Sequence, residues 1–228
     1  MIDDVRAARP QTETPARDAP DTPSRGRSWQ DSALVQNYLT GMRGAFPGAT
    51  EQFTMMVQLV ATLQRPVSRV LDLGAGDGVL TAALLDAFPG VEATILDFSP
   101  PMLAAARERF ADVQPPVRIL DRDLATEAWA SDLGSASFDV VVSGYAIHHL
   151  TDERKRAVYR DVFGLLTPGG IFINMEHVAS PSVRLAQLFD QSMVDALTQF
   201  RRREDPDLSR AAVEREYASR PDRHDNIL

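Results

Sequence analysis

A glycine-rich turn directly after a short apolar strand constrains this chain more than any other feature. Residues 70–78 read Val-Leu-Asp-Leu-Gly-Ala-Gly-Asp-Gly, and an apolar helical pattern follows over 79–88. Glycines at 74, 76 and 78 permit a sharp turn and let a ligand lie against bare main chain. The helix that follows offers free N–H groups and the positive end of its dipole. This arrangement predicts a nucleotide-cofactor site at the carboxyl end of the first strand of an α/β sheet.

The acidic residue inside this motif narrows the class of cofactor. A dinucleotide fingerprint, G-x-G-x-x-G, requires glycine where this chain has Val79. The Asp72 carboxylate would repel a pyrophosphate, whereas it suits a ligand that carries ammonium and sulfonium groups. The motif resembles the first motif of class I S-adenosylmethionine-dependent methyltransferases, which runs apolar-apolar-Asp-apolar-Gly-x-Gly-x-Gly.

Later segments extend the resemblance over residues 35–180 in the order found in that family. Further strands are expected at 91–97, 117–120, 138–143 and 171–175, the last after Pro-Gly-Gly. The nearly all-apolar 138–143 is typical of a parallel strand covered on both faces. Ser99 is expected to cap a helix with proline in its first turn. The predicted fold is α/β, a Rossmann-like, doubly wound, mainly parallel sheet with helices on both faces.

The resemblance implies S-adenosylmethionine as the cofactor and assigns residues to it. Asp72 would orient the amino-acid portion, while Gly74, Ala75 and Gly76 would allow close approach of the backbone. Asp97, roughly 20 residues beyond the glycines, is expected on the ribose hydroxyls. The other expected contacts are Phe98, Asp123 and Leu124 at the adenine and Ser143 on the methyl side. Arg43 either pairs with the cofactor carboxylate or is a solvated residue at a helix end.

Residues after the fourth and fifth strands are the candidates for binding or activating a methyl acceptor. Tyr145, His148 and His149 follow the fourth strand, and Glu176 and His177 follow the fifth. Each histidine of the first pair is a base, a hydrogen-bond donor or a packing residue. Glu176 and His177 either line the acceptor pocket or cap the next helix. Their spacing fits no standard zinc pattern, so no metal is expected.

A catalytic residue is not assigned from the sequence. Methyl transfer from a sulfonium depends mainly on alignment and desolvation. A general base is needed only where the acceptor must lose a proton early. The residues after the fourth and fifth strands are therefore candidates for the acceptor site, and none of them is assigned a catalytic role.

The two ends of the chain differ from its middle. Residues 1–27 are rich in Pro, Arg, Asp and Thr and are expected to form a disordered tail. The domain is expected to span 28–228, with N-terminal helices over 28–65, the cofactor-binding core over 66–180 and C-terminal helices over 181–228. The family sheet normally ends in an antiparallel hairpin, and no strand pattern follows residue 175. The sequence thus predicts a truncated or diverged copy whose fifth strand is an exposed edge, which favours pairing as a homodimer.

Composition limits the location and partners. The chain has 228 residues, no cysteine and a net charge of −8. It contains no apolar run long enough to span a membrane and no apolar signal core, so a cytoplasmic protein is expected. An acidic chain is not steered toward nucleic acid by its bulk charge, although a local basic patch is not excluded.

The expected function is transfer of a methyl group to a small-molecule acceptor, whose identity the sequence does not specify. One alternative comes from residues 43–48 and the regions of Pro-Gly-Gly and Glu176. These resemble carboxy-S-adenosylmethionine synthases of tRNA wobble modification, in which a late arginine binds the extra carboxylate. Arg210 and Arg215 lie in a comparable place. The other alternative is a cofactor-binding but inactive interaction module.

Overall fold

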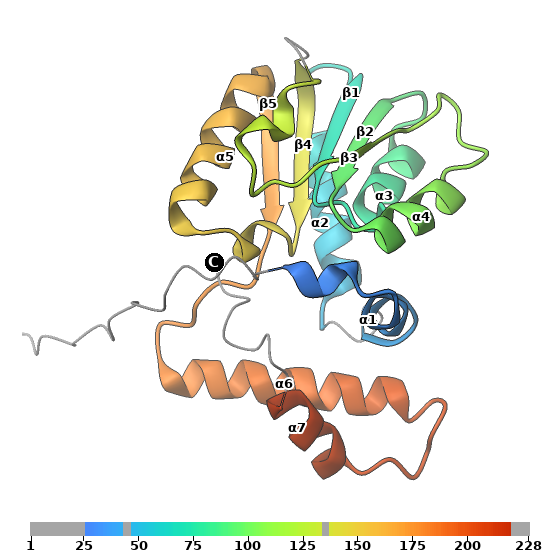
Figure 1. Cartoon of the computed structure of the whole chain (residues 1–228), viewed down its shortest axis with the longest axis vertical. Coiled ribbons are helices and arrows are strands. Elements are labelled where there is room, and N and C mark those ends of the chain that lie inside the picture. Colours follow the sequence, from blue (N-terminus) through green and yellow to red (C-terminus); the bar gives the residue numbers. More distant parts are fainter. Residues whose placement is uncertain (1–25, 43–46, 134–136, 220–228) are drawn as a thin grey trace, which may run out of the picture.

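A parallel five-stranded sheet forms the centre of the protein (Figure 1). The computed structural model describes residues 26–42, 47–133 and 137–219. The sheet order is β3-β2-β1-β4-β5. Its strands are β1 (Arg69–Leu73), β2 (Glu92–Asp97), β3 (Arg118–Asp121), β4 (Phe138–Gly144) and β5 (Leu166–Met175). The order reverses between β1 and β4, which is where open α/β sheets bind their ligands. The doubly wound parallel sheet expected from the sequence is confirmed.

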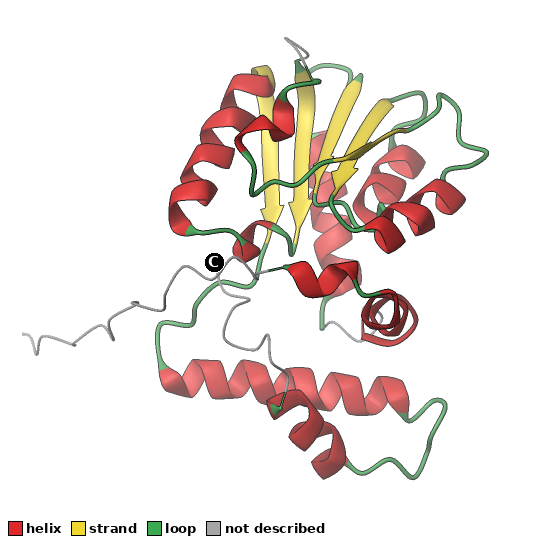
Figure 2. Ribbon diagram, in the orientation of Figure 1, coloured by secondary structure: helices red, strands yellow, loops and turns green. Residues whose placement is uncertain are grey.

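Helices cover both faces of this sheet (Figure 2). α2 (Ala49–Ala61) precedes β1, and α3 (Val79–Ala87) follows it. α4 (Pro100–Arg109) joins β2 to β3, and α5 (Asp152–Leu165) joins β4 to β5. Ser99 caps α4 as predicted, because its hydroxyl accepts a hydrogen bond from the Met102 N–H at 3.4 Å.

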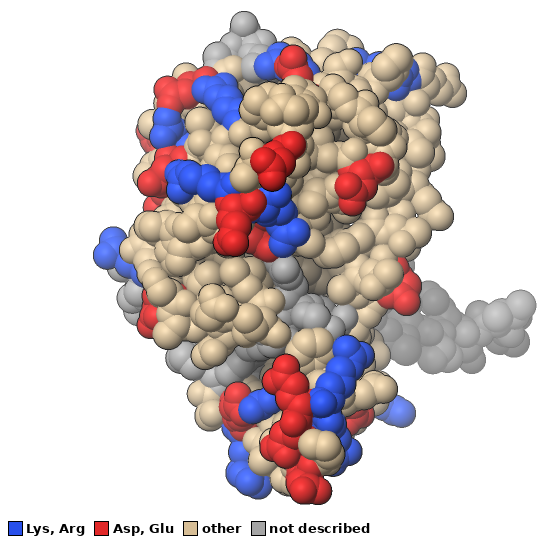
Figure 3. Space-filling view, turned by 90° about the vertical axis from the view of Figure 1, so that its right-hand side faces the viewer, with Lys and Arg blue, Asp and Glu red and all other residues tan. Residues whose placement is uncertain are grey.

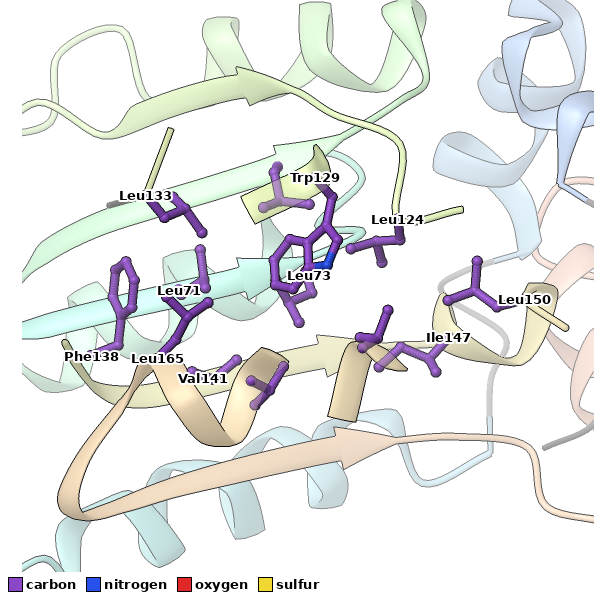
Figure 4. Packing of buried hydrophobic residues seen from close by; sticks show 13 residues of the cluster. Leu71, Leu73, Leu124, Trp129, Leu133, Phe138, Val141, Ile147, Leu150 and Leu165 are labelled. Carbon is purple, nitrogen blue, oxygen red and sulfur yellow. The ribbon is translucent and has the colours of Figure 1, made fainter. Parts of the chain in front are cut away.

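The alternation of side chains along the strands divides the core into two layers. Leu71, Leu73 and Val141 pack with α5 and with the fully buried Trp129 on one face (Figure 4). The opposite face packs against α2 and α3, and its strand residues are Val70, Val140 and Val142. Asp72 of β1 is a fully buried acidic side chain on the same strand as these apolar residues, an unusual position for an acid.

The N-terminal segment begins with a 3-10 helix, Arg27–Gln30, and α1 (Ser32–Asn37). Asp31 caps α1 through a 2.8 Å bond from the Ala33 N–H. Within the N-terminal helices expected over 28–65, a π-helical turn, Tyr38–Met42, follows α1 directly. The predicted disordered tail lies almost wholly in residues 1–25, outside the described residues.

Two further helices lie beyond the carboxyl ends of the strands (Figure 1). α6 (Val183–Arg201) and α7 (Arg210–Ala218) pack on each other through a cluster of their own. Within residues 26–219, gaps aside, no strand follows Met175, so β5 has only β4 as a neighbour. No helix in the described part of the chain combines the length and apolar character that a membrane crossing needs.

Candidate functional site

The glycine turn after β1 adopts backbone conformations that favour glycine. Gly74, Gly76 and Gly78 have φ values of +61°, +57° and +79°. A Cβ at Gly74 would collide with the Cβ of Ala146, and one at Gly78 would collide with the ring of Phe110. A Cβ at Gly76 would meet only the Met102 sulfur, at the ordinary contact distance of 3.5 Å. The turn is therefore tightly packed against protein atoms at Gly74 and Gly78, whereas at Gly76 it leaves room for a ligand.

This turn forms one wall of a cleft of about 2000 Å³ at the carboxyl edge of the sheet. The N-terminal segment from Gly26 to Tyr38 and the helices α6 and α7 supply other walls. Typical small-molecule pockets have about 300–1,000 Å³. The cleft therefore has room for a cofactor together with a second molecule.

Asp72 carries an oxygen without a partner at the wall of this cleft. Its side chain is fully buried, and Oδ2 accepts a hydrogen bond from the Thr81 hydroxyl at 2.8 Å. Oδ1 is buried and has no hydrogen-bond partner among the described residues. Burial raises the pKa of Asp72 from 3.8 to about 7, against the opposing effect of the Thr81 bonds. An unsatisfied carboxylate oxygen beside the glycine turn fits a cationic group such as an ammonium.

Asp97 connects the glycine turn to the start of α4. Oδ2 accepts a bond from the Gly76 N–H and Oδ1 one from the Ser99 N–H, both at 2.8 Å. Burial raises the pKa of Asp97, and these backbone N–H groups counteract that effect. Each carboxylate oxygen can accept a further hydrogen bond. The carboxylate lines the cleft and fits the hydroxyl groups of a ribose.

The expected adenine-side residues line the same cleft. Phe98 and Leu124 are among its lining residues, as is the exposed Asp123. Asp123 Oδ1 accepts a bond from the Ala125 N–H at 2.8 Å, and Arg154 Nε donates to the Leu124 carbonyl at 2.7 Å. The loop after β3 is thus stabilised by a hydrogen bond within the loop and by a second one from Arg154 of α5.

Two of the expected cofactor residues, Ser143 and Arg43, are not found among the described residues that line the cleft. Ser143 is fully buried and is not among the residues that line the cleft. Its hydroxyl donates to the Leu73 carbonyl at 2.9 Å, so it links β4 to β1 behind the site. Arg43 lies outside the described residues.

Tyr145 sits at the start of the acceptor side in a strained backbone conformation, with φ of +53°. Its N–H donates to the Met175 carbonyl and its hydroxyl to Gln52 Oε1, both at 2.8 Å. Burial and the nearby Glu176 raise the pKa of the phenol, while the Gln52 bond lowers it. Tyr145 is therefore a neutral hydroxyl fixed in the cleft by β5 and α2.

Glu176 and His148 form a close pair, although one follows β5 and the other β4. The Glu176 side chain is 2% exposed. Its Oε1 accepts a bond from the His148 backbone N–H at 3.1 Å, and its Oε2 lies 2.5 Å from His148 Nδ1. His149 faces a different partner, because its Nε2 accepts a bond from the Trp29 indole at 3.2 Å. His177 is exposed and also lines the cleft.

No group of three His, Asp or Glu side chains in the described residues is arranged to hold a metal ion. Tyr145, His148 and His149 each have a side-chain hydrogen-bond partner, namely Gln52, Glu176 and Trp29 in that order.

Sequence reasoning missed several residues that build the site. Thr81 satisfies one oxygen of Asp72, Gln52 holds Tyr145, and Arg154 holds the loop at Leu124. Trp29 lines the cleft from the N-terminal segment. A signal existed for Thr81, which is the one polar side chain in the first two turns of an apolar helix. Nothing comparable marks Gln52 or Arg154.

Comparison with known proteins identifies the class. Residues 71–172 match the family described as methyltransferase domain. Together with the sheet order and the glycine turn, this match supports the resemblance of this part of the chain to the class I S-adenosylmethionine-dependent methyltransferases. S-adenosylmethionine is the cofactor of this domain, as the motifs predicted.

Individual relatives support the same assignment. An uncharacterized methyltransferase of Mycobacterium tuberculosis is 43% identical over 115 residues, which are 50% of this chain and 53% of that protein. Carboxy-S-adenosyl-L-methionine synthase of Aeromonas salmonicida is 27% identical over 150 residues, 64% of this chain and 58% of that protein. A solved structure, the S-adenosylmethionine-bound amino pentose methyltransferase of Micromonospora echinaspora, matches with a TM-score of 0.51 at 27% identity, covering 62% of this chain and 56% of that chain. The chain spans about half the length of the curated relatives it matches.

Proposed function

We propose that the chain transfers a methyl group from S-adenosylmethionine to a small-molecule acceptor. One observation carries the proposal: the cofactor cradle and the polar groups after β4 and β5 line one continuous cleft. The free Oδ1 of Asp72 suits the ammonium of the cofactor, and Asp97 suits its ribose. A donor site and an acceptor site would then share a single cleft.

Bound S-adenosylmethionine supplies a sulfonium methyl group to a nucleophile. The residues of the chain align and desolvate the reacting groups, and effects of this kind are worth several kcal/mol, up to about 7–11 kcal/mol. Tyr145 is fixed at the boundary of the two halves of the cleft, between Gln52 of α2 and the end of β5. We assign it to the wall beside the methyl group.

The far wall of the cleft supports an acceptor with an apolar portion. α6 contributes large apolar side chains to the lining, namely Phe189, Met193, Leu197 and Phe200. Phe189 is 59% exposed, so it has surface to bury against a ligand. The solved relative is an amino pentose methyltransferase, which agrees with an acceptor of small-molecule size.

The alternative linked to tRNA modification lacks support from the late arginines. Arg210 pairs with Asp195 at 2.6 Å and with Glu214 at 2.9 Å. Neither Arg210 nor Arg215 is among the residues lining the cleft. On the face shown in Figure 3, Lys and Arg are interspersed with Asp and Glu and form no continuous basic surface. The cytoplasmic location and the pairing of chains through β5 stay predictions.

A thermal-shift titration with S-adenosylhomocysteine tests the proposal, with NAD as the control ligand. A ligand that binds only the folded state adds about 2.7 kcal/mol at a hundredfold excess over its dissociation constant. We expect S-adenosylhomocysteine alone to raise the melting temperature. A cooperative transition that neither ligand shifts would favour the inactive interaction module instead.

A further inference from the structure

We propose that Arg154 of α5 is the residue that positions the loop after β3 for selective binding of the adenine of the cofactor. This inference rests on the proposed function and deepens it, because it names a residue outside the loop on which the choice of adenine over another purine depends. It starts from two hydrogen bonds that meet at one peptide group, between Leu124 and Ala125.

The peptide group between Leu124 and Ala125 is held on both sides. Its carbonyl accepts a hydrogen bond from Arg154 Nε at 2.7 Å, and its N–H donates to Asp123 Oδ1 at 2.8 Å. The preceding peptide group is held by the Asp123 carbonyl, which accepts from the Thr126 N–H at 3.0 Å and from the Thr126 hydroxyl at 2.8 Å. Neither peptide group can rotate without losing a hydrogen bond.

Two polar groups of this loop remain for a ligand. Within the described residues, the Leu124 N–H and the second carboxylate oxygen of Asp123 form no hydrogen bond. Both residues line the cleft. A donor beside an acceptor matches the edge of adenine at which the ring nitrogen N1 accepts and the amino group donates. Hypoxanthine reverses this pattern, because its N1–H donates and its carbonyl oxygen accepts.

Arg154 can hold the loop because it is itself fixed on α5. Its side chain is only 13% exposed, and its backbone N–H donates to the hydroxyl of Thr151, the N-cap of this helix, at 3.2 Å. Its Nη2 lies 3.6 Å from Asp161 Oδ2, which also accepts the Trp129 indole N–H at 2.9 Å. Trp129 does not line the cleft, so the contact of Arg154 with Leu124 is the one that bears on a ligand.

Two substitutions of Arg154 separate its hydrogen-bond donor from its bulk. In Arg154→Gln the amide nitrogen lies as many bonds from the backbone as Nε does, so the bond to the Leu124 carbonyl can form without the charge. In Arg154→Met a methyl group takes the same place, and no donor remains. The matched control is Arg156→Met, at an exposed position of the same helix.

Calorimetry of the full chain with S-adenosylhomocysteine and with S-inosylhomocysteine, which carries hypoxanthine, measures the preference for adenine. We expect the unmodified chain to prefer S-adenosylhomocysteine by at least about tenfold. Arg154→Met should lower affinity for S-adenosylhomocysteine by about tenfold and affinity for S-inosylhomocysteine by less than about twofold, so the preference falls. Arg154→Gln should keep most of the preference, and Arg156→Met all of it.

Two outcomes would overturn the proposal. Equal losses for the two ligands in Arg154→Met would show that Arg154 supports the fold of the site and not the choice of purine. A preference as low in Arg154→Gln as in Arg154→Met would show that the bond to the Leu124 carbonyl is not responsible.

Amide hydrogen exchange of the ligand-free chain gives a readout that needs no cofactor. Without the bond from Arg154 the loop opens more often, so the Ala125 N–H should exchange faster in Arg154→Met than in Arg156→Met. Equal exchange rates would contradict the positioning role of Arg154 alone. Failure of the unmodified chain to bind either ligand would instead contradict the proposed function, and with it the assignment of this loop to adenine.

Discussion

The indole nitrogen of Trp29 donates a hydrogen bond to Nε2 of His149 at 3.2 Å, across a separation of 120 residues. The carbonyl of Trp29 accepts a second bond, from the Ser99 hydroxyl. Ser99 follows β2 and His149 follows β4, so the two bonds lie on opposite sides of β1 and its glycine turn. The segment from Arg27 to Gln30 therefore spans the cofactor cradle.

Trp29→Phe should weaken binding of S-adenosylhomocysteine, because the ring keeps its apolar surface but loses its donor. A typical hydrogen bond contributes about 0.5–1.5 kcal/mol, which corresponds to roughly a two- to tenfold loss of affinity. Isothermal titration calorimetry would measure it. Removal of residues 1–25, which ends before this segment, is the control and should leave affinity unchanged. Equal affinities for Trp29→Phe and the unmodified chain would show that the segment does not close on the ligand.

The buried Asp72 should make the stability of the ligand-free protein fall as the pH rises. Its folded-state pKa of about 7 lies above the ordinary 3.8, so the folded chain binds this proton more tightly than the unfolded chain. The associated stability is present below about pH 4 and is lost as the pH rises through about 7, by at most about 1.4 kcal/mol per pH unit. Urea unfolding between pH 4.5 and 8 should show this slope reduced in Asp72→Asn. Parallel pH profiles for the two proteins would contradict it.

Binding of S-adenosylhomocysteine should release protons near pH 6.5. The ammonium of the ligand favours the charged form of Asp72, which is largely protonated in the free protein at this pH. Calorimetry in two buffers of different ionisation enthalpy would count the protons, and we expect up to about one. Asp72→Asn should abolish the release. Proton uptake by the unmodified chain would place the ammonium elsewhere.

Asp97→Ala should lower affinity for S-adenosylhomocysteine by about 1–3 kcal/mol, the cost of losing charge-assisted hydrogen bonds. Because Asp97 also holds the Gly76 and Ser99 N–H groups, the melting temperature of the free variant must be measured beside its affinity. Asp86→Ala, at an exposed position of α3, is the matched control. Unchanged affinity in a folded Asp97→Ala protein would remove this carboxylate from the site.

Gly78→Ala should destabilise the fold more than Gly90→Ala, although both glycines have positive φ. The left-handed conformation costs a non-glycine residue about 1–2 kcal/mol at either position. At Gly78 the new methyl group also meets the Phe110 ring, whereas it meets nothing within 4 Å at Gly90. Overpacking typically adds about 1–3 kcal/mol. Thermal unfolding of the two variants measures the difference. Equal melting temperatures would show that the Phe110 ring at the end of α4 moves aside without a loss of stability.

The sheet and the cofactor cradle were predictable because their signals are local. An apolar strand, a glycine turn and an acid at the end of the next strand lie within 30 residues of each other. The strand order also follows from the family resemblance. Placement of Asp97 beside Gly76 needed only the parallel pairing of β1 with β2.

The acceptor side was less predictable because its contacts join distant segments. Glu176 and His148 are 28 residues apart, and Tyr145 and Gln52 are 93 apart. No periodicity marks such pairs in a sequence. The sequence also does not indicate that the hydroxyl of Ser143, a polar residue near the end of β4, donates to the Leu73 carbonyl of the neighbouring strand.

The helices α6 and α7 have an apolar core that is separate from the two layers of the sheet. Met193, Val194 and Leu197 close against Val213 and Tyr217 and share no buried residue with the clusters around β1 and β4. Substitutions in this helical pair can therefore accumulate without disturbing the packing under the glycine turn. Under the proposed function, the acceptor preference of such a chain can change over evolutionary time while the glycine turn and its packing are inherited unchanged.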